Sequence, residues 1–195
     1  REQLVQQERE RMRRQLRHLE LDDATLQRLS DTLPAAYILN TPIPTMATHL
    51  KFLDQLPQEK VIVDFYPLEG RSFAEMTVIA YDDEKPGLLS KICAVVHAAG
   101  AEIIAAHVYT LLGNELNSKW MSSAPEYGRN VVLDRLHIVA GGRTLTTSQT
   151  AKIAATMRDV LLDELSVEDL LKNANRKMAS SVTPTKISAR NDLSD

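Results

Sequence analysis

The stretch that decides the fold spans residues 74–110 and reads AEMTVIAYDDEKPGLLSKICAVVHAAGAEIIAAHVYT. Side chains alternate over 75–81, which is typical of a half-buried strand. Pro86 suits the first turn of a following helix, because its missing N–H has no partner there. Gly100 fits the left-handed residue that ends a helix, and a second strand follows from Glu102 to Thr110. The helical spacing predicts one apolar face made of Leu88, Leu89, Ile92, Val95, Val96 and Ala99.

The C-terminal part of the chain continues this alternation of strands and helices. Residues 131–139 predict a third strand, and Thr146 with Gln149 is the signature of a capping box that begins a second helix. A short further helix is expected from Val167, and a last strand near 185–189. The order predicts an α+β, ferredoxin-like βαββαβ domain, in which an antiparallel sheet carries both helices on one face. The polar segment 113–128 joins two strands, and its Trp120 is expected either to anchor an interface or to cover the sheet edge.

The N-terminal part is helical and proline-rich. Residues 1–20 are strongly charged, with a thin apolar stripe, so we expect an exposed helix that projects from the domain and exchanges its amide hydrogens readily. Asp22 or Asp23 can cap a second helix that Pro34 ends. Residues 34–60 hold four prolines and one short helix within 45–56, and 61–66 predict a strand that leads into the domain.

Composition excludes several classes of function. The 195 residues are 44% hydrophobic and 25% charged, as in ordinary globular proteins, and the net charge of −3 does not favour nucleic-acid binding. No apolar run reaches the roughly 18 residues that a membrane span needs. The single cysteine, Cys93, is expected to be a small buried side chain, and a chain without disulfides fits the cytoplasm. The chain begins at Arg1, so we expect a piece of a longer protein.

The sequence groups no residues for catalysis. There is no phosphate-binding glycine loop, no carboxylate pair in a nucleotidyltransferase loop and no His-Asp doublet. The five histidines are scattered, without an i, i+4 pair for a metal. His49 is expected to be a packed or hydrogen-bonded structural residue. His137 and Asp134 should point to opposite faces of their strand and form no dyad.

Binding chemistry is concentrated in the loop 82–89, before the first helix of the domain. The backbone N–H groups at a helix start suit a carboxylate, and acidic side chains in the same loop suit an ammonium group. The alternative is a capped helix start without a ligand. The candidate ligand-binding residues in this loop are Asp83, Glu84, Gly87, Leu88 and Leu89.

Two motifs carry a resemblance to a known family. The segments Glu84-Lys85-Pro86-Gly87-Leu88-Leu89 and Ala98-Ala99-Gly100-Ala101-Glu102-Ile103 resemble an ACT domain, a module that usually binds amino acids. The flanks Leu33-Pro34-Ala35-Ala36-Tyr37, with Ile43 and His49, and Leu133-Asp134-Arg135-Leu136 are similar to the C-terminal region of bifunctional PII uridylyltransferase/uridylyl-removing enzymes. This similarity runs from about residue 30 to the end.

The resemblance implies a ferredoxin-like fold, glutamine or another small amino acid as ligand, and a site between paired ACT domains, in cis or in trans. It also implies upstream catalytic domains that modify the PII signalling protein and use Mg²⁺; none of their residues occurs here, so no cofactor is expected in this fragment. ACT domains of this group usually carry Asn where this chain has Glu102. The resemblance thus adds Glu102 to the candidate ligand-binding residues. A carboxylate only accepts hydrogen bonds, so a Glu102 that lines the site should favour the ammonium or side-chain amide end of a ligand and repel its carboxylate.

The sequence therefore predicts a regulatory fragment in four parts: linker helices over 1–33, a proline-rich connector with a short helix and strand over 34–70, an ACT-like domain over 71–191, and the start of a linker over 192–195. A structural docking module without a ligand is the alternative, and a free-standing enzyme is disfavoured. We expect the chain alone to bind glutamine weakly or not at all.

Overall fold

The computed structural model describes residues 2–18, 21–68, 70–82, 87–113 and 128–181. The expectations for Asp83, Glu84, Trp120 and a strand at 185–189 lie outside these residues. The described strands are β1 (Val61–Pro67), β2 (Ala74–Tyr81), β3 (Glu102–Leu111) and β4 (Val131–Val139). They form one antiparallel sheet in the order β1-β2-β4-β3.

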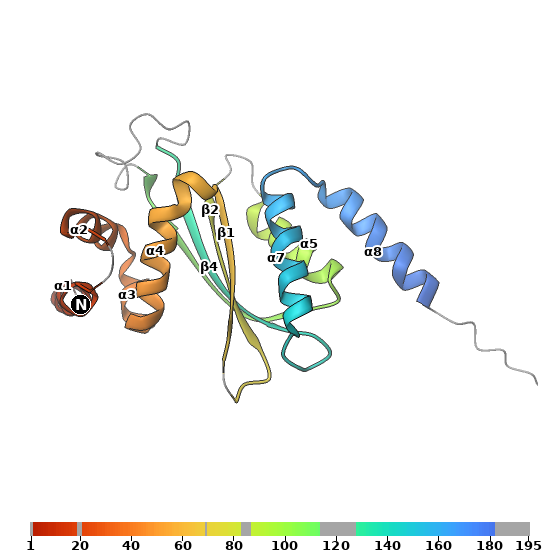
Figure 1. Cartoon of the computed structure of the whole chain (residues 1–195), viewed down its shortest axis with the longest axis horizontal. Helices are drawn as coiled ribbons and strands as arrows, with labels where there is room; N and C mark the ends of the chain where they lie inside the picture. The colour runs from red at the N-terminus through yellow and green to blue at the C-terminus, as the bar shows by residue number, and fades with distance from the viewer. Residues whose placement is uncertain (1, 19–20, 69, 83–86, 114–127, 182–195) are drawn as a thin grey trace, which may run out of the picture.

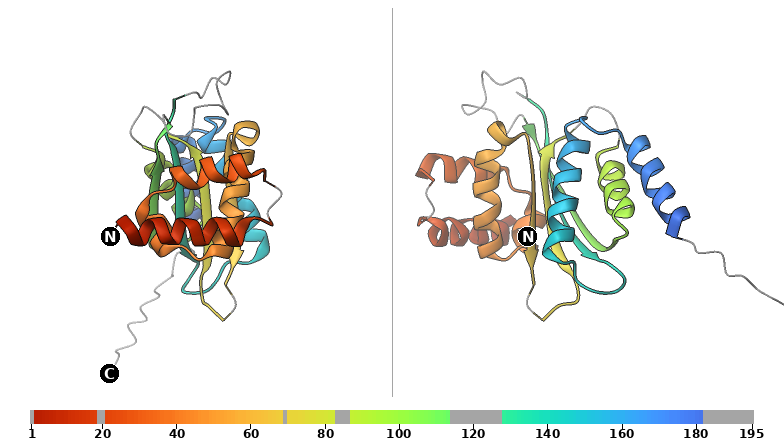
Figure 2. Two further views of the ribbon diagram at one scale, coloured as in Figure 1. Left: turned by 90° about the vertical axis from the view of Figure 1, so that its left-hand side faces the viewer. Right: turned by 45° about the vertical axis from the view of Figure 1, so that its right-hand side comes forward.

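Helices cover both faces of this sheet (Figure 1). One face carries α5 (Leu88–Ala98) and α7 (Thr147–Leu161), and α8 (Val167–Ser181) packs against α5. The other face carries α1 (Glu2–Leu16), α2 (Asp23–Thr32), α3 (Ala35–Asn40) and α4 (Ile43–Glu59). The two turned views show the sheet between these two helical layers (Figure 2). The architecture confirms the predicted ferredoxin-like α+β class with an N-terminal helical extension.

Strand β1 occupies an edge of the sheet. It pairs antiparallel with β2 along its whole length, from Val61 opposite Ala80 to Pro67 opposite Ala74. In the βαββαβ order that the sequence predicts, the final strand would pair beside this same central strand. Residues that the sequence places in the connector therefore complete the sheet, because their backbone N–H and C=O groups pair with the free side of β2.

The face of α5 that packs on the sheet is narrower than predicted. Ile92, Val95 and Val96 are buried, as expected, in a core shared with α7 and the even-numbered residues of β4. Leu89 is 46% exposed, and Cys93 is exposed as well, which contradicts the expectation of a buried cysteine. Successive helical positions rotate by about 100°, so residues directly after Leu88 and Ile92 turn toward solvent.

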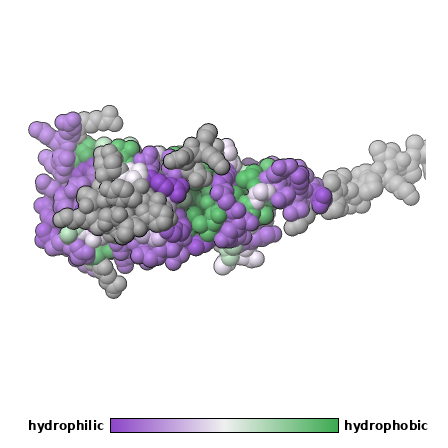
Figure 3. All heavy atoms as spheres, turned by 90° about the horizontal axis from the view of Figure 1, so that it is seen from above, coloured by the Kyte–Doolittle hydropathy of each residue, from purple (hydrophilic) through white to green (hydrophobic). Residues whose placement is uncertain are grey.

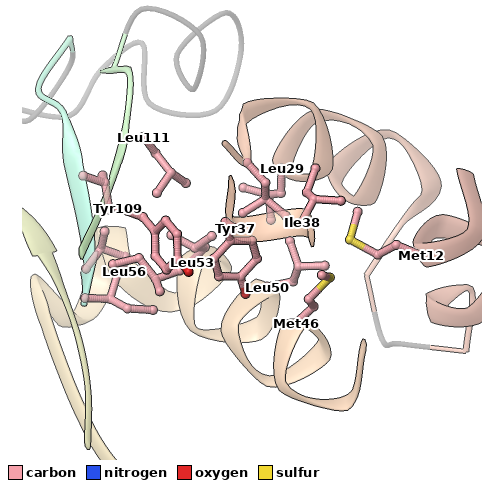
Figure 4. Packing of buried hydrophobic residues seen from close by; sticks show 14 of the residues in the cluster. Met12, Leu29, Tyr37, Ile38, Met46, Leu50, Leu53, Leu56, Tyr109 and Leu111 are labelled. Atoms are coloured by element: carbon pink, nitrogen blue, oxygen red, sulfur yellow. The ribbon is translucent and has the colours of Figure 1, made fainter. Parts of the chain in front are cut away.

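The helix at the N-terminus does not project from the domain. Val5, Met12 and Leu16 are buried in a second core that continues through α2, α3 and α4 to the other face of the sheet (Figure 4). Arg9 donates to the backbone carbonyls of Ser30 and Leu33, and Arg13 pairs with Asp31. The apolar stripe is thin, but α2–α4 offer it a matching surface that the sequence of α1 alone does not reveal.

Local signals for the helix ends are confirmed. The Asp22 side chain accepts from the Thr25 N–H at the start of α2, and Thr146 with Gln149 forms the predicted capping box of α7. Helix α4 is longer than the predicted short helix and buries Met46, His49 and Leu50 on one side. Pro57 lies in its last turns.

Candidate functional site

The start of α5 offers backbone hydrogen-bond donors. Gly87 lies at the N-cap with φ 149°, and no side chain caps the helix there in the described part of the chain. A Cβ on Gly87 would meet no atom within 4 Å, so the backbone conformation, rather than space, requires glycine. Leu88 is buried in the core between α5 and the sheet, whereas Leu89 is exposed to solvent. The first N–H groups of α5 have no intrahelical partners, and they carry the positive end of the helix dipole.

Hydrogen bonds join the residues that flank the ends of β2, β3 and β4. The Asp82 N–H donates to the Asn130 carbonyl at 2.8 Å, and the Arg129 guanidinium donates to the Asp82 carbonyl at 3.1 Å. The Asn130 side chain accepts from the Gly113 N–H at 3.0 Å. A side chain at Gly113 would clash with the Arg129 carbonyl, since its Cβ would lie 2.3 Å away. Sequence reasoning missed these residues; their only signal was a polar Arg-Asn pair directly before a predicted strand.

Hydrophobic side chains lie beside the start of α5. Leu89 and, at the end of α7, Leu162 are the exposed large apolar residues there. Seen from above, the space-filling view shows hydrophobic atoms gathered on the side of the molecule that carries α5, α7 and α8 (Figure 3). Lys91 forms an ion pair with Asp163 at 2.7 Å and joins α5 to the α7–α8 turn. The helix start therefore combines backbone donors with apolar surface, as small-ligand sites do.

Glu102 lies apart from the other predicted site residues. It opens β3, pairs with Val139 and is exposed, at the end of α5 opposite to Gly87. An eleven-residue helix is about 16 Å long, so one chain does not bring Glu102 to the Gly87 N–H groups. Within one copy of the chain, the structure brings together Gly87, Leu88 and Leu89.

A buried carboxyl group near this site was not foreseen as functional. Asp134 is 1% exposed on the α5/α7 face of the sheet, between Val78 and Val108 in register. Its Oδ1 has no hydrogen-bond partner among the described residues. Burial raises the pKa of Asp134 to about 7; the Tyr109 backbone N–H opposes this shift and the charge of Asp82 adds to it. A buried carboxyl that titrates near neutral pH is typical of functional sites.

Asp134 should make stability depend on pH. The unfolded chain loses this proton near the ordinary pKa of 3.8, whereas the folded chain holds it up to about 7. Stability therefore falls as the pH rises from about 4 to about 7, and then levels off. Asparagine cannot ionise, so Asp134→Asn should remove this fall in stability. We expect the variant to raise the free energy of unfolding by about 2–4 kcal/mol above pH 7 and to change it little near pH 4. Urea unfolding at several pH values measures the difference.

The control for this experiment is Asp159→Asn, at an exposed position of α7. It makes the same chemical change without the burial, so its effect should be small at every pH. A pH-independent effect of Asp134→Asn would show that the pKa of Asp134 is the same in the folded and the unfolded chain.

The opposite face of the sheet carries buried polar residues. His49 is buried and hydrogen-bonded to the Tyr37 hydroxyl and to Thr77, which confirms its structural role. Arg135 holds Glu75 with two hydrogen bonds, of 2.7 and 3.2 Å. Burial alone would raise the pKa of Glu75, but Arg135 and His137 outweigh it and lower that pKa.

The titratable residues form no metal centre in the described part of the chain, where no group of three or more His, Cys, Asp or Glu side chains could hold an ion. Asp134 and His137 lie on opposite faces of β4, as predicted.

Comparison with known proteins gives a partial match. No known family profile matches the chain. Over 104 residues, it is 29% identical to a bifunctional uridylyltransferase/uridylyl-removing enzyme of Gluconobacter oxydans (strain 621H). The matched segment is 52% of this chain but only 11% of that protein. The chain thus resembles a small part of a much longer protein. Within the described residues, no helix combines the length and the hydropathy needed to cross a membrane.

Proposed function

We propose that this chain is a regulatory unit of a uridylyltransferase/uridylyl-removing enzyme, and that its ACT-like domain senses a small amino acid such as glutamine. The start of α5, which no described side chain caps and where Gly87 has a conformation that favours glycine, carries the proposal. Its N–H groups suit the α-carboxylate of the ligand, and the acidic residues that precede it in the sequence suit the α-ammonium group. The similarity to the Gluconobacter enzyme supports the same assignment. The unit would act in the cytoplasm, on catalytic domains that modify the PII protein.

The edge strand β3 is the surface for a second ACT domain. Ile104 is 53% exposed and Val108 52% exposed, and one side of β3 has no partner strand in the described part of the chain. An exposed apolar edge is a template for pairing with another chain or domain. Pairing there would place Glu102, at the start of β3, in the interface.

A docking module without a ligand is the second candidate. The same exposed β3 edge favours it, since edge pairing needs no amino acid. Glu102 favours it as well, because its carboxylate would repel a ligand carboxylate. The two candidates differ in one observable, namely whether an amino acid changes the association of the chain.

Glutamine binding should depend on protein concentration. We expect calorimetric titration of the dilute chain to show binding weaker by about a hundredfold than that of the associated chain, because half a pocket leaves the ligand solvated. Sedimentation with and without glutamine reports the association. Gly87→Val should abolish binding, since valine cannot easily take the φ of 149°.

The matched control is Gly142→Val, which strains a positive-φ glycine in the turn before α7. It should leave binding unchanged if the chain stays folded by circular dichroism. Association without any glutamine effect would favour the docking module. Tight binding at every concentration would contradict the paired site.

A further inference from the structure

The sheet face covered by α4 is divided into an apolar half and a polar half. The register aligns Ile62, Ile79, Leu133 and Tyr109 across the four strands, and these side chains join the second core. Two residues further along each strand, the register aligns Asp64, Thr77, Arg135 and His107. The next row aligns Tyr66, Glu75 and His137. The polar half lies under the first turns of α4, near the β1–β2 turn.

A cavity of about 220 Å³ lies between this polar half and α4. Helix α4 contributes Thr45, Thr48 and His49, and the strands contribute Asp64, Glu75 and Thr77. His49, Glu75 and Thr77 are buried, so the cavity floor is built from polar side chains held by the fold. The volume suits a ligand of a few heavy atoms. This cavity lies on the sheet face opposite to α5.

A hydrogen-bond relay directs a donor into the cavity. The Tyr37 hydroxyl lies 2.8 Å from His49 Nδ1, and His49 Nε2 lies 3.2 Å from Thr77 Oγ1. Burial, with the nearby charge of Arg135, lowers the pKa of His49 to about 4, so the ring is neutral near pH 7. The buried Tyr37 O–H needs an acceptor, which makes Nδ1 the acceptor and Nε2–H the donor to Thr77. The Thr77 hydroxyl proton is then left to donate to a molecule in the cavity.

The charges around the cavity select the ligand. Glu75 is neutralised by the two hydrogen bonds from Arg135. Asp64 has no ion-pair or hydrogen-bond partner for its carboxylate within the described ranges. No Lys or Arg lines the cavity. The cavity therefore presents one uncompensated negative charge and one hydroxyl donor.

We propose that this cavity binds a small organic ammonium ion that also carries an acceptor oxygen, with the ammonium on Asp64 and the oxygen on the Thr77 hydroxyl. A zwitterion is disfavoured, because its carboxylate would face Asp64 and Glu75. This site is therefore distinct in place and in ligand charge from the proposed amino-acid site at α5, and it stands whether or not that site binds glutamine.

The test uses three probes of similar size in an amide-resonance NMR titration of the whole chain at neutral pH. Glycinamide has an ammonium group and a carbonyl oxygen, glycine adds a carboxylate, and acetamide lacks the ammonium. We expect glycinamide to shift the amide signals of Thr48, Asp64 and Thr77 with millimolar affinity, and glycine and acetamide to shift them far less. Equal shifts from all three probes, or no shift with glycinamide, would overturn the proposal.

Two variants locate the site. Asp64→Asn should weaken glycinamide binding by about tenfold or more, the loss expected for a charge-assisted hydrogen bond. Thr77→Val keeps the side-chain shape and should weaken it by a smaller factor. Asp159→Asn, on α7 beyond the other face of the sheet, is the matched control and should bind glycinamide unchanged. Unchanged binding by folded Asp64→Asn would refute the assignment.

Discussion

Replacing Arg135 with methionine should lower the free energy of unfolding by about 3–5 kcal/mol. Arg135 and Glu75 are both nearly inaccessible to solvent, and their closest nitrogen–oxygen distance is 2.7 Å. Arg135 also donates to the Thr41 hydroxyl at 3.4 Å, so it ties α3 to the sheet. Without the guanidinium, Glu75 remains as a buried carboxylate that, among the described residues, keeps only His137 as a charge partner. Chemical denaturation measures this loss of unfolding free energy, with one spectroscopic probe in each of the two helical layers that cover the sheet.

A double variant separates the pair from its surroundings. Arg135→Met with Glu75→Met replaces both charges by apolar side chains and should recover most of the lost stability, because no buried charge is left without its partner. Arg11→Met is the matched control. Arg11 pairs with Glu8 on the surface of α1, and such pairs contribute less than about 1 kcal/mol. A similarly small loss for Arg135→Met would mean that water reaches Glu75.

Truncating Leu16 to alanine should cost about 2–5 kcal/mol, although the residue lies in a helix that the sequence assigns to the surface. Leu16 is 2% exposed and packs in the core that joins α1–α4 to the sheet. Removing three buried carbons loses their burial and leaves a cavity among residues that cannot fully close it.

Leu4→Ala is the control on the same helix, because Leu4 is 50% exposed; its cost should stay within about 0.5 kcal/mol. Hydrogen exchange adds an independent measurement, since an integral α1 should approach the protection of α5. Equally small losses of stability for both substitutions would contradict a buried α1 and support the predicted helix that projects from the domain.

In the candidate site, as in the fold, local features could be predicted from the sequence and contacts between distant residues could not. The helix start at Gly87 could be predicted from the sequence, because a glycine and the first turn of a helix are recognised from neighbouring residues. Asn130 and Gly113 could not be assigned to the same loop, since their contacts join positions 17 residues apart. Asp134 looks like any alternating polar residue in a strand, and only the packing of α5 and α7 makes it a buried carboxyl.

By itself, the sequence determined the local elements of this protein: the strand before Tyr81, the helix after Gly87, the cap of α2 and the capping box of α7. Each depends on hydrogen bonds or side-chain periodicity within a few residues, which the order of amino acids specifies directly. Only the tertiary structure decided that β1 closes the edge of the sheet, that α1 is part of a core, and that His49 of α4 bonds to Thr77 on the same polar half of the sheet that carries the Arg135–Glu75 pair. Those outcomes depend on which surfaces far apart in the chain complement each other. The apolar stripe of a helix or the alternation of a strand shows which face is buried, but not which surface that face packs against.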